Sequence, residues 1–120
     1  MRSAEQTAIL LAAILNRSGQ GRARVSAKTI KILAERQNLR GAFAAEVIDA
    51  LAEYSWILFE LGGGGFGAIQ AKALEAAKPV TAKRWLSADE RRELRRGTAD
   101  LTVFEREANP EQEQEVSDDE

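Results

Sequence analysis

Apolar residues recur at helical spacing in three segments of the first half of the chain, and this pattern predicts three amphipathic helices. The expected helices span residues 4–17, 27–37 and 42–54. Ser3 and Gln6 form a capping-box pattern before the first helix, and Ser26 is placed to cap the second. The expected inner faces consist of Thr7, Leu10, Leu11, Ile14 and Leu15 in the first helix, Ile30, Leu33 and Ala34 in the second, and Phe43, Val47, Leu51 and Tyr54 in the third.

Two short segments have the composition of β-strands. Residues 22–26 alternate in polarity, and residues 56–61 are rich in aromatic and branched side chains. Four consecutive glycines, followed by Phe66 and Gly67, come directly after the second segment. We interpret them as the tip of a β-hairpin, because glycine adopts positive φ angles without steric cost. Residues 66–74 would then form the return strand, although the five alanines of residues 68–78 favour a helix, and both structures stay open.

The same glycines also match the spacing of a dinucleotide-binding loop. Gly62, Gly64 and Gly67 satisfy the pattern G-x-G-x-x-G, in which backbone amides approach a pyrophosphate at the start of a helix. In a dinucleotide fold, however, the strand before the loop opens a βαβ unit, whereas here it follows three expected helices. The order of elements therefore favours the hairpin, with nucleotide binding as the alternative.

The second half of the chain is more polar. Ser87 and Glu90 form a second capping box, which predicts a charged helix over residues 88–96 that ends before Gly97. Beyond Phe104 the chain is acidic, and we expect disorder there. The expected organisation is a folded domain over residues 1–78, a helical extension over residues 79–104 and a disordered acidic tail over residues 105–120.

Charge is distributed unevenly. The chain has 17 basic and 19 acidic residues, and eight of the acidic residues but only one basic residue lie in residues 105–120. The remainder holds 16 basic and 11 acidic residues, a net charge of +5, which suggests an anionic partner. The acidic tail is either a solvated end or a competitor of nucleic acid for the basic body.

The composition also argues against several classes of function. The absence of cysteine and histidine removes disulfides, thiolate zinc sites and the commonest general base, so we expect neither enzymatic activity, nor a metal, nor a cofactor. Apolar runs are shorter than a membrane helix needs, so we expect no membrane partner and a cytoplasmic location.

Basic residues that could contact phosphates cluster around the second expected helix. The expected exposed face of the third helix, by contrast, carries Glu46, Asp49 and Glu53, which repel phosphates. Phe66 either returns to the core or is exposed at the hairpin tip as a partner contact. The candidate nucleic-acid-binding residues are Arg22, Arg24, Lys28, Lys31, Arg36 and Arg40, together with Lys72 on the expected return strand.

From Val25 to Leu74 the chain resembles a winged helix-turn-helix domain of bacterial regulators. The junction Leu51-Ala52-Glu53-Tyr54-Ser55-Trp56-Ile57 is similar to the sequence that leads from the last helix into the wing strand of such domains. The resemblance implies a mainly α fold with a small β-hairpin, formed by three helices plus a wing, with a C-terminal helical extension. It also implies a cytoplasmic, non-enzymatic transcription regulator that binds double-stranded DNA and can pair as a homodimer. The acidic third helix and the almost uncharged wing favour the alternative, a protein-interaction module that does not bind DNA.

Overall fold

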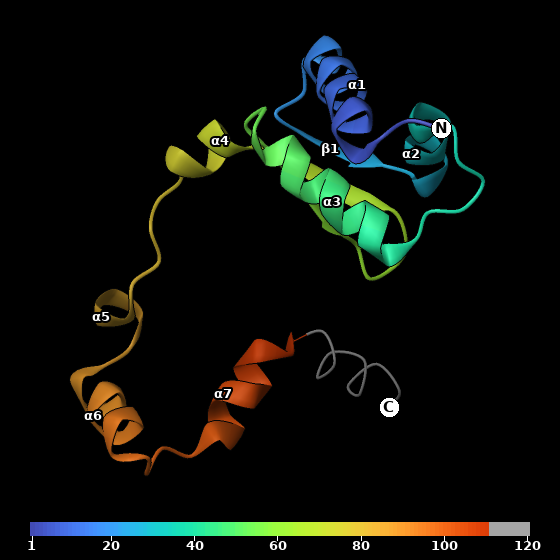
Figure 1. Ribbon diagram of the computed structural model, residues 1–120. Coiled ribbons are helices and arrows are strands. Elements are labelled where there is room, and N and C mark those ends of the chain that lie inside the picture. Colours follow the sequence, from blue (N-terminus) through green and yellow to red (C-terminus); the bar gives the residue numbers. More distant parts are fainter. Residues whose placement is uncertain (111–120) are drawn as a thin grey trace, which may run out of the picture. The chain divides into compact units, whose positions relative to one another are not determined.

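The computed structural model describes residues 1–110 (Figure 1). The described chain is mainly helical with a small three-stranded antiparallel sheet, which confirms the expected fold class at this level. It divides into two compact units, residues 1–77 and a second unit that begins at Lys78.

The first unit contains both the sheet and the main helices. Its elements are α1 (Ala4–Ser18), β1 (Arg22–Val25), α2 (Ala27–Ala34), α3 (Gly41–Ala52), β2 (Trp56–Glu60), β3 (Phe66–Gln70) and α4 (Ala71–Glu75). Helix α2 is shorter than predicted because Glu35 adopts a left-handed conformation, with φ of 54°. The return segment contains both of the structures left open by the sequence. It is extended from Phe66 to Gln70 and helical from Ala71 to Glu75.

The predicted helix caps are confirmed. The Gln6 backbone N–H donates to Ser3 Oγ at 3.1 Å, and the Ser3 backbone N–H donates to Gln6 Oε1 at 3.0 Å. Ser26 Oγ accepts the Thr29 backbone N–H at 3.1 Å. Each bond satisfies a backbone donor that the first turn of a helix leaves unpaired, so these short sequence patterns set where α1 and α2 begin.

The three strands are antiparallel in the order β1-β3-β2. Strands β2 and β3 are joined by the glycine turn, where the Leu61 N–H donates to the Gly65 carbonyl at 3.0 Å. Gly64 and Gly65 have φ angles of 103° and 77°, which side-chain-bearing residues rarely adopt. The hairpin interpretation is therefore confirmed. The dinucleotide-loop alternative is wrong, because a strand and not a helix follows the glycines.

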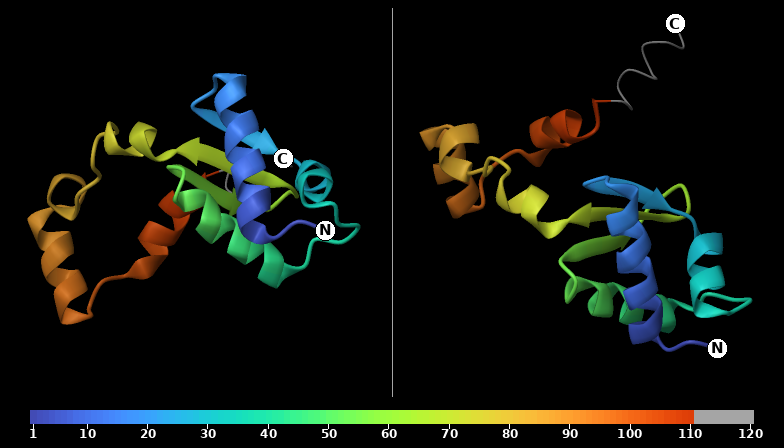
Figure 2. Two further views of the ribbon diagram at one scale, coloured as in Figure 1. Left: turned by 45° about the horizontal axis from the view of Figure 1, so that its top comes forward. Right: turned by 90° about the horizontal axis from the view of Figure 1, so that it is seen from above.

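The core lies between the helices and one face of the sheet. Helix α1 packs against α2 and α3, and α3 packs against β2 (Figure 2). Trp56 is fully buried, and its indole N–H donates to Asn16 Oδ1 at 3.0 Å. Tyr54, predicted to belong to the inner face of the third helix, is exposed instead, because α3 ends at Ala52 and Tyr54 lies in the following turn.

The second unit consists of short helices: α5 (Ala82–Trp85), α6 (Ala88–Arg96) and α7 (Leu101–Ala108). The capping box before α6 is confirmed, with the Glu90 N–H donating to Ser87 Oγ at 3.1 Å. The disorder expected from residue 105 onward is wrong for Glu105 to Ala108, which belong to α7. Asp100 caps this helix by accepting the Thr102 N–H at 3.0 Å. The rest of the predicted acidic tail, residues 111–120, lies outside the described residues.

Candidate nucleic-acid interface

Helix α3 presents one buried and one exposed face. Phe43, Val47 and Leu51 are buried against the core, as predicted from their spacing. Glu46 and Asp49 are exposed, and Lys, Arg, Asn and Gln are absent from Gly41 to Ala52. Those four residue types supply most contacts to base edges in the major groove. The face that α3 presents to solvent is therefore poorly suited to read a DNA sequence.

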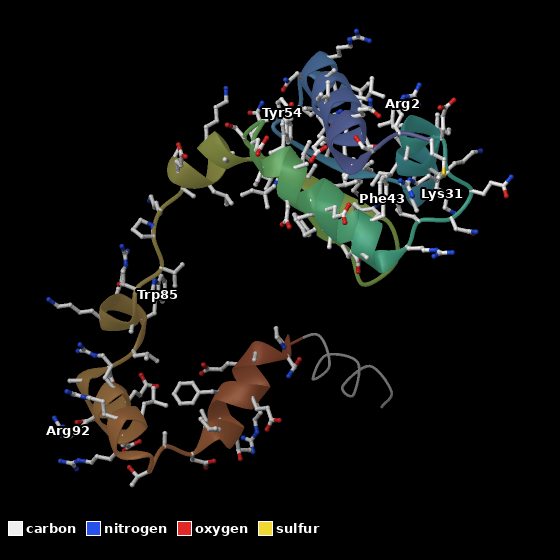
Figure 3. All side chains as sticks on the ribbon, in the orientation of Figure 1. Arg2, Lys31, Phe43, Tyr54, Trp85 and Arg92 are labelled. Carbon is white, nitrogen blue, oxygen red and sulfur yellow. The ribbon has the colours of Figure 1, made fainter. Side chains whose placement is uncertain are left out.

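Positive charge gathers instead at the N-terminal end of α3. Arg40 is the exposed N-cap residue of this helix, while Lys28 and the half-buried Lys31 lie one turn apart on α2. A hollow of about 430 Å³ is lined by Lys31 and Asn38, and an adjoining one of about 370 Å³ by Asn38 and Arg40. Figure 3 shows Lys31 near this end of α3 and Tyr54 near the other. We call Lys28, Lys31 and Arg40 the α3 basic cluster.

The glycine turn borders the same place. The hollow beside Lys31 is also lined by Leu61, Gly64 and Gly65, so the tip of the β2–β3 hairpin lies next to the α3 basic cluster. Glu60 lines it too and offsets part of its charge. The hairpin thus adds backbone groups to this surface, but no positive charge.

Arg36 is half-buried and lines the hollow beside Arg40, but its main contacts lie within the fold. One of its terminal nitrogens, Nη2, donates to the Arg2 carbonyl at 3.1 Å, and its guanidinium carbon lies 3.7 Å from the centroid of the Phe43 ring. Arg2 in turn donates from Nη1 to the Leu33 carbonyl at 2.9 Å. The two arginines therefore connect the N-terminus to α2 and α3. The Nη2 bond and the ring contact of Arg36 serve the fold, whereas its buried Nε forms no hydrogen bond among the described residues, so Arg36 is a weaker candidate for phosphate binding than Arg40.

Three other predicted residues lie on other elements, although Arg24 also lines a hollow with Gly64 and Gly65 of the hairpin tip. The register pairs Arg22 with Ile69 and Arg24 with Gly67, and both arginines are exposed on the face of the sheet that turns away from the core. Lys72 belongs to α4 and not to the return strand, so that assignment is wrong. It lines a hollow with Tyr54 at the C-terminal end of α3, opposite to Arg40.

Of the two alternatives for Phe66, its return to the core at the start of the next strand is confirmed, and an exposed partner contact is wrong. Phe66 begins β3 and is only 5% exposed, because its side chain returns to the core. The exposed aromatic residue of this hairpin is Phe59, which the sequence reasoning did not single out. A signal for it existed: residues 56–59 are all apolar, and an unbroken apolar run is typical of a strand with two apolar faces.

Within residues 1–110, groups of three or more acidic side chains that could hold a metal ion are absent. No helix in this part of the chain is long and apolar enough to cross a membrane. The chain matches no protein-family model, no curated protein and no solved structure. The functional argument therefore depends on the geometry of the chain itself.

Proposed function

We propose that the first unit is a winged helix-turn-helix domain. Its order of elements, α1-β1-α2-α3-β2-β3, and its sheet order, β1-β3-β2, support this assignment. Helices α2 and α3 and their short connection correspond to the helix-turn-helix, and the glycine-tipped β2–β3 hairpin corresponds to the wing.

We further propose that this domain binds duplex DNA through backbone phosphates and acts as a cytoplasmic regulator of transcription. The observation that carries the proposal is the α3 basic cluster, in which Lys31 lies beside the hairpin tip, Lys28 one turn before it on α2, and Arg40 at the adjoining hollow. The N-terminal end of a helix also has a partial positive charge, which adds to that of Arg40. Because the exposed face of α3 is acidic beyond its first turn, phosphate contacts rather than base contacts provide the affinity.

Binding through phosphates predicts how steeply the affinity for DNA falls with salt concentration. Three phosphate contacts give a slope of about −2.7 for log affinity against log salt, since each contact contributes about −0.9. A dimer that places two such clusters on one duplex would double this slope.

The test compares two double variants of the full-length protein that each lose two positive charges. Lys28→Ala/Arg40→Ala removes charge from the proposed interface, whereas Arg17→Ala/Lys72→Ala removes exposed charge from the opposite end of α3. The two ends are about 18 Å apart, the length of a 12-residue helix. Duplex binding is measured by fluorescence anisotropy across a range of salt concentrations.

We expect the first variant to bind more weakly and its salt slope to fall by about two, while the second variant retains the slope of the natural protein. Equal losses in the two variants, or no binding by the natural protein at low salt, would refute the proposal.

A chain that ends at Asn109 lacks six acidic residues of the tail and should bind DNA at least as tightly as the full chain.

A further inference from the structure

The face of the sheet that turns away from the core forms a second surface, distinct from the α3 basic cluster. The register aligns Ile57, Ile69 and Arg22 in one row across the three strands, and Phe59, Gly67 and Arg24 in the next. The residues between these rows, such as Leu58 and Ala68, belong to the buried core. We call this surface the outer sheet face; its members are Arg22, Arg24, Ile57, Phe59, Gly67 and Ile69, with Leu61 and Leu74 at its margin.

The outer sheet face is apolar although it is accessible to solvent. Ile57 is 39% exposed and Phe59 is 44% exposed. An antiparallel sheet with one solvated face normally carries polar residues there. Contiguous exposed apolar surface with a polar rim marks an interaction site. The side chains of the two outer rows therefore indicate that another layer covers this face.

Phe59 and Gly67 together shape the floor of a groove. A Cβ atom built on Gly67 would lie 2.5 Å from Cζ and 2.7 Å from Cε2 of the Phe59 ring, so the ring lies directly over the glycine. This close approach is open only to glycine. The resulting groove has a volume of about 800 Å³, and Arg22 and Leu74 are among the residues that line it.

The dimensions of the groove fit a single α-helix. The outer two of three neighbouring strands lie about 9.6 Å apart, close to the diameter of about 10 Å of a helix with its side chains. The five residues of β2 extend over about 17 Å, which corresponds to about 11 helical residues. A helix packed on a sheet is also one of the stable layer arrangements of proteins.

The charged residues that line the groove indicate which side chains a helix bound there would carry. Arg22 and Arg24 line one side, the β2 side is apolar, and the lining contains no carboxylate. Among residues 1–110, the side chain of neither arginine forms a hydrogen bond or an ion pair. Two residues apart on a strand, they are about 6.6 Å apart, which is close to the rise of about 6 Å between residues i and i+4 of a helix.

We propose that the outer sheet face binds an amphipathic helix of a protein partner. The apolar stripe of that helix packs on Ile57, Phe59 and Ile69, and two carboxylates at positions i and i+4 on its flank pair with Arg22 and Arg24. A nucleic acid fits this face less well, because Phe59 is its single aromatic residue and the other apolar members are aliphatic. The inference does not depend on DNA binding by the α3 basic cluster.

The test uses two designed helical peptides of about 16 residues with an identical stripe of leucine and phenylalanine. One carries glutamate at the two flanking positions and the other carries lysine. Binding to the full-length protein is measured by titration calorimetry. We expect the glutamate peptide to bind at least fivefold more tightly at low salt, and this preference should reverse in the Arg22→Glu/Arg24→Glu variant.

A matched pair of variants separates the groove from general hydrophobicity. Phe59→Ser should weaken binding of the glutamate peptide at least tenfold, because it removes the floor of the groove. Ile9→Ser removes an exposed apolar side chain from α1 and should leave binding unchanged. Circular dichroism of both variants checks that the fold is retained.

Three outcomes would overturn the proposal. Equal affinity for the two peptides, or no affinity for either, would show that the face does not select an acidic helix. Self-association of the natural protein that Phe59→Ser abolishes would identify the occupant as a second copy of the chain. Binding of an oligothymidine that Phe59→Ser abolishes would assign the face to single-stranded nucleic acid.

Discussion

The two faces of the sheet are formed by alternate residues of the same strands, and both are apolar. Trp56 and Leu58 point toward the helices and are 1% and 2% exposed, whereas their neighbours Ile57 and Phe59 point outward and are 39% and 44% exposed. The composition of β2 therefore does not distinguish its two faces. Burial was decided by α3, which packs against β2, and by α1, whose Asn16 accepts from the Trp56 indole; within residues 1–77 the short α4 borders the other face.

The largest expected effect comes from truncating the same strand on each of its faces. Trp56→Ala should lower the free energy of unfolding by about 3–5 kcal/mol, because it leaves a cavity among close-packed residues. Phe59→Ala should lower it by only about 1 kcal/mol, because its ring is already half solvated. Urea denaturation of both variants measures the difference. Similar losses would mean that the outer face is as well covered as the inner one.

An intermediate effect is expected from the hydrogen bond that satisfies the buried indole. Asn16→Ala removes the acceptor 3.0 Å from Trp56 Nε1 and leaves a buried donor unpaired. The expected loss is about 1–3 kcal/mol, since a buried unsatisfied group forfeits its hydration. Thermal unfolding of the Asn16→Ala, Trp56→Phe and doubly substituted proteins isolates this bond. If the effects of the two substitutions were simply additive, the hydrogen bond would contribute nothing.

The smallest effect tests the contact between Phe59 and Gly67 on the outer face. Gly67→Ala places a methyl group where the Phe59 ring lies, so the ring must move. We expect a loss of about 1 kcal/mol, in the range of small packing changes. In a Phe59→Ala background the same substitution should be neutral or stabilising, because alanine suits a strand better than glycine once the ring is gone. An unchanged effect in that background would show that the backbone and not the ring makes glycine necessary.

Local chemistry made most helices and the hairpin predictable. Ser3, Ser26 and Ser87 cap helices because their hydroxyl groups accept backbone N–H donors of the first turn, a bond between residues close in sequence. The turn at Gly64 and Gly65 follows from positive φ angles that glycine adopts easily. Such caps and turns can be predicted from neighbouring residues alone.

The candidate sites were harder to predict, because they depend on contacts between distant segments. Arg36 carries the same charge as Arg40, yet it is engaged by Arg2 and Phe43 and so differs in role. Phe66 and Phe59 flank the same turn, and the register of the sheet determines which of the two is buried. A shift of one residue in the pairing of β2 with β3 would have placed both rings on the same face of the sheet.

The sequence by itself determined the three main helices, the caps of α1 and α2, the glycine hairpin and the uneven distribution of charge, because each follows from the chemistry of neighbouring residues. Only the tertiary structure decided which face of the apolar strand is covered and where the return strand becomes a helix. It also decided which arginines are exposed and which form contacts within the fold. These outcomes depend on strand register and helix packing, and both are set by contacts between residues far apart in the chain.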